Sequence, residues 1–235
     1  IGANNETGAI ASTSEIGEIV RRAGGLYHVD AVQTLGRIPV SVTEWNADLV
    51  TFSSHKIGGP RGAGALWVRR GLDLEPLHHG GHQERNRRGG TESVVNHVGF
   101  GAACEAAVGR RTEMWDRVGA LRDRLWAGLE AAMPEARRLS PTEDCLPNTL
   151  LAAFPGVKGE ALLMALDMAG IAMSTGSACT AGSLEPSHVL LAMGVDDRTA
   201  RSAVRFSLGI ETSVEEIDRT LGLLCPLLPQ LRGAA

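Results

Sequence analysis

Residues 48–53 (Asp-Leu-Val-Thr-Phe-Ser) constrain the fold most, because the centre of this short run is apolar on both faces. A strand buried on both faces belongs to a sheet that helices cover on both sides. Residues 26–29 and 64–68 predict two more strands, with helical crossovers between the strands. The sequence therefore predicts an α/β fold. In such sheets ligands bind beyond the carboxyl ends of the strands, where Asp30 and the run Ser53-Ser54-His55-Lys56 are expected.

A helix is predicted near the start of the chain. Ser12-Thr13-Ser14-Glu15 has the residue types of a capping box. Ile16, Ile19 and Val20 then recur at helical spacing, and the pair Gly24-Gly25 is expected to end the helix.

The rest of the chain predicts a long loop, a helical stretch and a smaller α+β unit. Residues 71–92 are rich in Gly, His and Arg, and loops of this length are usually functional or disordered. Residues 93–133 are expected to be one long helix or two in series. In the smaller unit, strands are expected near residues 150–154, 171–174 and 203–207, and helices near residues 160–169, 185–193 and 214–228.

Composition excludes several classes of function. The chain has 235 residues, a net charge of −4 and no basic stripe, so nucleic acid is not an expected partner. No apolar run reaches the roughly 18–20 residues that span a bilayer, so no membrane partner is expected. The four cysteines lack CxxC spacing, which argues against a disulfide framework and favours a reducing, cytoplasmic setting.

The first residues, Ile1-Gly2-Ala3-Asn4-Asn5, have no basic region and no apolar region of the kind found in signal peptides. They also lack Met and begin inside what reads as a strand. We therefore expect the chain to be the later part of a longer protein.

Lys56 is one of two lysines, beside 21 arginines. Arginine can replace lysine in most surface roles, but its guanidinium stays protonated and cannot form an imine. A lysine amine reacts with an aldehyde when it is neutral, which desolvation or a nearby positive charge promotes. The polar run before Gly58-Gly59-Pro60 offers a rigid platform for such an amine. The alternative is a surface lysine at a strand end, and this segment alone favours that alternative.

Asp30 and Gln33 follow the first predicted strand. A carboxylate at the ligand end of a sheet can pair with a protonated pyridine nitrogen, as on pyridoxal 5'-phosphate (PLP), and keep the ring an electron sink. Gln33 could donate to the phenolic oxygen of that ring. The alternative is that Asp30 caps a helix and Gln33 is merely exposed.

Cys179 lies in Gly176-Ser177-Ala178-Cys179-Thr180, among small residues that offer nothing bulky to pack. An accessible thiol with an ordinary pKa of about 8.5 is a few per cent thiolate at neutral pH and is a good nucleophile. The alternative is a buried small apolar residue, which is the usual environment of cysteine. Cys104, Cys145 and Cys225 lie on helical or Pro-flanked apolar stretches, and we assign that structural role to them.

Arg205 lies inside an apolar strand, where its charge needs a partner. A substrate carboxylate held by both prongs of the guanidinium is one such partner, and a structural salt bridge is the other. His78, His79 and His82 do not complete a metal site with any Cys or carboxylate pattern, so no metal is expected.

Six segments together resemble the cysteine desulfurases of the class V, fold-type I, PLP-dependent aminotransferase superfamily, most closely their housekeeping and nitrogen-fixation branch. They span nearly the whole chain in one order. They are Asn4-Asn5-Glu6-Thr7-Gly8, His28-Val29-Asp30-Ala31-Val32-Gln33, Ser53-Ser54-His55-Lys56-Ile57-Gly58-Gly59-Pro60, Arg88-Gly89-Gly90-Thr91, Gly176-Ser177-Ala178-Cys179-Thr180 and Arg205-Phe206-Ser207.

The resemblance implies a cofactor, PLP, and residues that hold it. Lys56 would bind PLP as an imine and later move protons at the substrate's α-carbon. Asp30 would bind the pyridine nitrogen and Gln33 the phenolic oxygen. Ser53 and His55 would bind the phosphate.

The resemblance also implies a substrate and partners. Thr91 would reach the phosphate across a homodimer interface. Asn5 and Arg205 would orient the adduct of PLP with the substrate, L-cysteine, and its carboxylate, so Asn5 would contact both the cofactor and the substrate. Cys179 would take the substrate's sulfur as a persulfide, leaving L-alanine, and pass it to an acceptor such as an iron–sulfur cluster scaffold protein or a thiolation acceptor.

The resemblance further implies a division of the chain, with residues 1–111 as the remaining part of a large PLP-binding α/β domain. Residues 112–235 would be a small α+β C-terminal domain that carries the cysteine loop. Nothing in the chain matches the family's N-terminal half, which supplies a phosphate-binding loop and a histidine that stacks on the PLP ring. We therefore expect the isolated chain to bind PLP poorly. The alternatives are a selenocysteine lyase, another class V aminotransferase-like enzyme, or an inactive fragment that acts as a docking partner.

Overall fold

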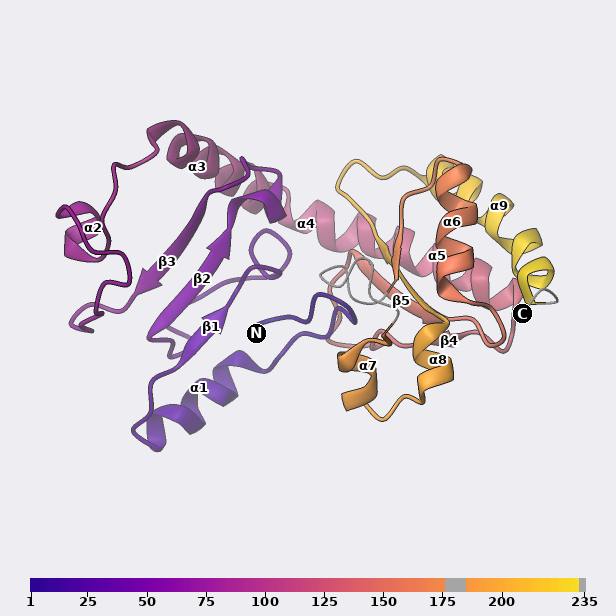
Figure 1. The fold of residues 1–235 in the computed structure, drawn as a ribbon, viewed down its shortest axis with the longest axis horizontal. Coiled ribbons are helices and arrows are strands. Elements are labelled where there is room, and N and C mark those ends of the chain that lie inside the picture. Colours follow the sequence, from indigo (N-terminus) through magenta and orange to yellow (C-terminus); the bar gives the residue numbers. More distant parts are fainter. Residues whose placement is uncertain (176–184, 233–235) are drawn as a thin grey trace. The chain divides into compact units, whose positions relative to one another are not determined.

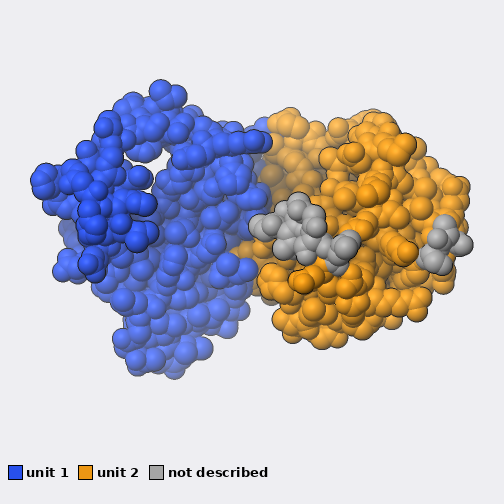
Figure 2. All heavy atoms as spheres, in the orientation of Figure 1, with its two compact units in different colours: residues 1–2, 11–111 blue, residues 3–10, 112–235 orange. Residues whose placement is uncertain are grey.

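The computed structural model describes residues 1–175 and 185–232 of the chain. It divides into two compact units, which Figure 2 shows in blue and orange. Unit 1 consists of Ile1–Gly2 and Ala11–Arg111, and unit 2 consists of Ala3–Ile10 and Thr112–Ala235. The assignment of Ala3–Ile10 differs from the expected division of the chain, because this segment hydrogen-bonds within unit 2.

Unit 1 is built on a three-stranded sheet with the order β1-β2-β3, seen in the indigo-to-purple part of Figure 1. The strands are β1 (His28–Asp30), β2 (Leu49–Ser53) and β3 (Gly64–Val68). β1 and β2 are parallel, and β3 is antiparallel to β2. The expectation of helical crossovers between these strands is wrong, because residues 31–48 between β1 and β2 form turns and no helix, and β3 follows β2 after a short connection. The short connection holds only the 3₁₀ helix η1 (Ser54–Ile57), and parallel strands need a crossover of a dozen residues or more.

Helix α1 (Thr13–Arg22) packs differently from the pattern in the sequence. Its expected capping box does not form, because Ser12 makes no side-chain capping hydrogen bond. Ile16 and Ile19 are 40% and 58% exposed, whereas Gly17 is buried. A Cβ atom at Gly17 would lie 1.9 Å from the backbone oxygen of Trp45, so the helix packs through its glycine.

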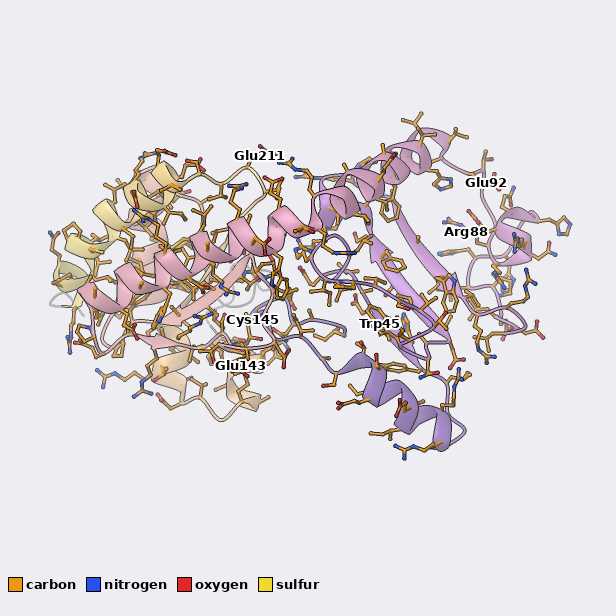
Figure 3. The ribbon with its side chains drawn as sticks, turned by 180° about the vertical axis from the view of Figure 1, so that it is seen from behind. Trp45, Arg88, Glu92, Glu143, Cys145 and Glu211 are labelled. Atoms are coloured by element: carbon orange, nitrogen blue, oxygen red, sulfur yellow. The ribbon has the colours of Figure 1, made fainter. Side chains whose placement is uncertain are left out.

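Beyond the sheet, unit 1 contains α2 (Gln83–Asn86) in the predicted long loop and then α3 (Val94–Gly109). The apolar core of this unit consists of residues that flank or form the first two strands: Val29, Ala31, Trp45, Ala47 and Val50. Trp45 is labelled in Figure 3.

The predicted long helical stretch is present with two interruptions. α3 ends at Gly109, and α4 (Arg111–Glu113) leads into one π-helical turn, η2 (Met114–Val118). α5 (Gly119–Ala132) then continues to within one residue of the expected end.

Unit 2 contains a four-stranded antiparallel sheet with the order β4-β5-β7-β6. The strands are β4 (Arg137–Arg138), β5 (Thr149–Ala153), β6 (Ser174–Thr175) and β7 (Ala203–Ser207); the remaining helices are α6 (Gly159–Met168), α7 (His188–Ala192), α8 (Asp197–Arg201) and α9 (Val214–Arg232). α6 and α9 begin within one residue of their expected starts, whereas α8 was not expected. α7 begins three residues later than expected, after Ser187, whose hydroxyl caps the helix by accepting from the Leu190 N–H.

Both faces of β5 are buried. Leu150 and Ala152 belong to the large core with residues of α5, α6 and α9, whereas Leu151 and Ala153 pack with Leu190 of α7 and its neighbours. Because successive side chains of a strand point to opposite faces, β5 contributes side chains to both apolar cores of unit 2. Among the described residues, no helix is both long and apolar enough to cross a membrane.

Candidate active site

Asp30 and Ser53 end the two parallel strands of unit 1. The register pairs Asp30 with Thr51, and the Ala31 N–H donates to the Thr51 carbonyl at 2.9 Å, so the carboxyl ends of β1 and β2 lie at one edge of the sheet. The Asp30 Oδ1 atom accepts a hydrogen bond from the Val32 N–H at 2.9 Å. This bond orients the half-buried carboxylate at the edge where α/β sheets bind ligands.

The segment after β2 is a short, well-anchored loop. Ser54 is buried, and its carbonyl oxygen accepts from the N–H groups of both Gly58 and Gly59. Gly58 has φ of 82°, a left-handed conformation that favours glycine. His55 and Lys56 are exposed, and the His55 Nδ1 atom lies 2.8 Å from the Ser53 hydroxyl oxygen.

Small residues of α3 support this loop. A Cβ atom at Gly59 would lie 2.9 Å from the Ala103 Cβ, and a Cβ at Gly99 would lie 2.9 Å from the Pro60 ring. Gly99 and Ala103 are four residues apart and therefore share one face of the helix. The loop that carries Lys56 thus packs on α3 where neither side has a large side chain.

Gln33 lies in the turn that follows β1, and Arg37 ends that turn. The Arg37 Nη1 atom donates to the Gln33 carbonyl, and Nη2 donates to the Lys56 carbonyl, both at 3.0 Å. The structure therefore brings the Gln33 turn and the Lys56 loop together. Sequence reasoning missed Arg37, because nothing in the sequence distinguishes it from the other arginines.

Thr91 lies in the exposed segment that leads into α3, between Arg88 and Glu92, which Figure 3 labels. Gly89 is buried against the backbone of the same loop, where a Cβ would lie 2.8 Å from the His79 carbonyl oxygen. The described residues contain no group of three or more His, Cys, Asp or Glu side chains that could hold a metal ion.

In unit 2, Asn5 and Arg205 are joined directly. Asn4 Oδ1 accepts from the N–H groups of Glu6 and Thr7, both at 2.9 Å, which folds this segment into a tight turn. The exposed Asn5 lies in that turn, and its carbonyl oxygen accepts from Arg205 Nη1 at 2.7 Å.

The same turn is anchored by two buried residues. The Ser187 hydroxyl donates to the Glu6 carboxylate at 2.5 Å, and Glu6 is only 2% exposed. Cys145 Sγ lies 3.7 Å from the Thr7 carbonyl oxygen. Sequence reasoning noted Glu6 only as part of a motif and did not consider Ser187, because their contact joins positions that are 181 residues apart.

The cysteines divide into two groups. Cys179 lies outside the described residues. Cys145 is buried, and Cys104 and Cys225 are half-buried. Burial raises the pKa of all three thiols above its ordinary value, which keeps them protonated near neutral pH. This is the environment expected for structural cysteines.

Comparison with known proteins gives one consistent result. Residues 1–220 match the family described as aminotransferase class-V. A cysteine desulfurase of Cereibacter sphaeroides is 46% identical over 98% of this chain, and the cysteine desulfurase NifS of Azotobacter vinelandii is 43% identical over 99% of it. The solved structure of a NifS-like protein superposes with a TM-score of 0.90 at 40% identity over 98% of the chain.

The match covers only part of these relatives. The chain spans 59% and 58% of the lengths of the two desulfurases, and 60% of the solved NifS-like chain. The predicted α/β fold of the fold-type I class is confirmed by these neighbours.

Proposed function

Because the chain belongs to the class-V aminotransferase family, we propose that the intact protein, meaning the natural polypeptide that contains residues 1–235, is a PLP-dependent cysteine desulfurase. The observation that carries the proposal is the edge of the unit 1 sheet. There the ends of β1 and β2 present Asp30 and Ser53, and a loop anchored on Ser54 presents Lys56 to solvent. The desulfurase relatives support the choice of reaction.

The residues at this edge have the chemistry that PLP requires. Asp30 offers a carboxylate to the protonated pyridine nitrogen. Gln33 offers an amide N–H to the phenolic oxygen, and Ser53 and His55 offer donors to the phosphate. The 2.8 Å contact between Ser53 and His55 holds these two donors together. Lys56 offers the only amine in this loop.

Each residue then has one task. Bound PLP supplies an electron sink for charge that develops on the substrate's α-carbon. Lys56 would hold the cofactor through its amine and would move protons at the α-carbon of L-cysteine. Arg205 binds the substrate carboxylate through its guanidinium, and Asn5 orients the bound substrate. The hydrogen bond from Arg205 to the Asn5 carbonyl fixes these two residues against each other.

Cys179 carries the sulfur chemistry. Its thiolate attacks the sulfur atom of the substrate, so a sulfur–sulfur bond forms while the carbon–sulfur bond breaks. The electron pair of the broken bond stays on carbon, which takes up a proton and leaves as L-alanine. The sulfur remains on Cys179 as a persulfide. An acceptor protein, such as an iron–sulfur cluster scaffold, then takes the sulfur, and we place this chemistry in the reducing cytoplasm, where a free thiol persists.

A homodimer belongs to the proposal, with Thr91 reaching the phosphate of the partner subunit. At the start of α3, three residues after Thr91, Val94, Val95 and Val98 are 68%, 83% and 67% exposed. An apolar patch of this kind favours a protein interface beside Thr91.

The test is turnover of L-cysteine by the intact protein. We expect equal amounts of L-alanine and of sulfane sulfur, with the persulfide found on Cys179 by peptide mass spectrometry. Cys179→Ser should abolish the persulfide, whereas the matched variant Cys225→Ser, at a half-buried helical thiol, should leave turnover unchanged. If Cys179→Ser still releases sulfur from cysteine, the proposed mechanism is wrong. Much faster turnover of selenocysteine than of cysteine would favour a selenocysteine lyase.

A further inference from the structure

We propose that Arg37 is a positioning residue that holds the loop carrying Lys56 against the turn carrying Gln33. The inference rests on the proposed function, in which Lys56 and Gln33 bind neighbouring groups of the same cofactor, its aldehyde carbon and its phenolic oxygen. Arg37 touches neither the cofactor nor the substrate in this account, and it acts through the backbone of both segments.

The guanidinium of Arg37 connects two segments that follow neighbouring strands of the sheet, β1 and β2. Nη1 donates to the Gln33 carbonyl within the turn, and Nη2 donates to the Lys56 carbonyl, 19 residues away in the sequence. Each bond is 3.0 Å long. The planar fork of arginine presents its donors at fixed angles, so two simultaneous bonds set the separation of the two carbonyls.

The Lys56 carbonyl needs a donor from outside its own loop. At the end of η1, the N–H groups of Gly58 and Gly59 both turn back to the Ser54 carbonyl. Carbonyls in the last turn of a helix lack partners within the helix, and here a cation supplies one.

The backbone of Arg37 is itself fixed. Its N–H donates to the Thr34 carbonyl at 3.0 Å. The preceding Gly36 has φ of 75°, and a Cβ there would lie 2.7 Å from the Ala107 Cβ of α3. The guanidinium therefore projects from a turn that is braced on the same helix that supports the Lys56 loop.

Arg37 binds two backbone carbonyls, whereas several other arginines of the chain bind carboxylates. Arg69, Arg124 and Arg201, for example, each pair with an aspartate. Among the described residues no carboxylate pairs with Arg37, although its Nε is shielded from solvent and burial lowers its pKa. A surface arginine kept only for charge would be expected beside a carboxylate or in open solvent, not on two backbone carbonyls.

The test uses the intact protein and three variants. Arg37→Gln removes the fork and the charge, and Arg37→Lys keeps the charge but cannot reach two carbonyls from one planar group. If Arg37→Gln does not fold, Arg37→Lys alone is compared with the wild type. The matched control is Arg22→Gln, because Arg22 also binds the carbonyl four residues before it, that of Glu18, but bridges to no second segment in the described part of the chain.

Two measurements are made on each variant. The first is amide hydrogen exchange at Gly58 and Gly59 in the protein freed of PLP. The second is the rate constant with which Lys56 forms its covalent bond when PLP is added, followed by visible absorbance. We expect exchange to be faster and bond formation to be slower in both Arg37 variants, each by about three- to tenfold, the effect of one hydrogen bond partly open to solvent. Arg22→Gln should match the wild type in both.

The outcomes distinguish a failure of the positioning role of Arg37 from a failure of the proposed function. Arg37 variants that match Arg22→Gln in exchange, or that show faster exchange with unchanged bond formation, overturn the positioning role. Full rescue by Arg37→Lys overturns the two-pronged geometry. If the wild type forms no covalent bond with PLP while exchange still rises in the Arg37 variants, the proposed function fails and the contact between the two segments stands.

Discussion

Replacing Gly59 by alanine should displace the loop that carries Lys56. A Cβ atom at this position would lie 2.2 Å from the Ser54 Oγ, 2.9 Å from the Ala103 Cβ and 3.2 Å from the Ser54 carbonyl oxygen. The Ser54 side chain is fully buried, and Ala103 lies on α3. The new methyl group must therefore push the loop away from α3.

The expected cost follows from this overlap. Overpacking a closed site by one methyl group typically costs about 1–3 kcal/mol, and two contacts below 3 Å place Gly59→Ala in the upper half of that range. The Ser54 hydroxyl has no hydrogen-bond partner among the described residues, so Ser54→Ala alone should change stability by less than about 1 kcal/mol. In the Ser54→Ala variant the Oγ atom that lies 2.2 Å from the new Cβ is absent, so adding Gly59→Ala should lower the free energy of unfolding by only about 1 kcal/mol.

The assay is urea unfolding of the intact protein, freed of PLP, with the midpoint compared across the four members of this cycle. Gly101→Ala is the control, because a Cβ at that exposed position of α3 meets nothing within 4 Å. Alanine is favoured over glycine in a helix by about 0.5–1 kcal/mol, so the control should stabilise the protein slightly. A Gly59→Ala protein as stable as the wild type, or a cost unchanged by Ser54→Ala, would refute the packing argument.

Three further outcomes follow from the structure. Gly8→Ala should lower the free energy of unfolding by about 1–3 kcal/mol in urea titrations, because φ there is 79° and the new Cβ would lie 3.0 Å from Cys145 Sγ. Burial alone raises the pKa of Asp48, but the Tyr27 N–H and the ion pair with Arg69 outweigh it, so its folded pKa is lowered. Asp48 therefore stabilises the fold above its unfolded pKa of about 4, and this contribution is lost as the pH falls through the lower folded pKa. In urea titrations, the difference in stability between the wild type and Asp48→Asn should be largest above about pH 5 and should shrink at more acid pH. Alkylation of Cys145 by iodoacetamide at neutral pH, followed by mass spectrometry, should be slower than that of an unstructured peptide thiol, because burial raises its pKa.

The sequence was sufficient to predict that the candidate site residues Asp30, Ser53 and Lys56 lie at one edge of the unit 1 sheet. A doubly apolar strand followed by polar residues places Ser53 and Lys56 at a sheet edge, and the parallel pairing of β1 with β2 places Asp30 at the same edge. The pattern could not predict that β3 turns back antiparallel, because the periodicity of a strand carries no information on its direction.

Other features depend on contacts that no local pattern encodes. Helix α1 packs through Gly17 against Trp45, although its apolar residues Ile16 and Ile19 suggested a different face of the helix. The contact of Arg37 with the Lys56 loop joins distant positions through a backbone carbonyl, which is present at every residue and therefore leaves no trace in the sequence.

The same limit applies to unit 2. The segment Asn4–Gly8 reads as part of the first domain, but Arg205 and Ser187 bind it in the second. The hydrogen bonds from Ser187 and Arg205 to this segment span 181 and 200 residues, and composition or spacing within the segment does not reveal them.

The central claim is that Lys56 holds PLP covalently, and one measurement tests it directly. The intact protein is incubated with PLP, reduced with borohydride and digested, and the cofactor-bearing peptide is identified by mass spectrometry. The account predicts a reduced PLP adduct on Lys56 and none on Lys158, the exposed lysine that precedes α6 and the only other lysine of the chain. An adduct on Lys158 or at a residue outside 1–235, with Lys56 unmodified, would contradict it.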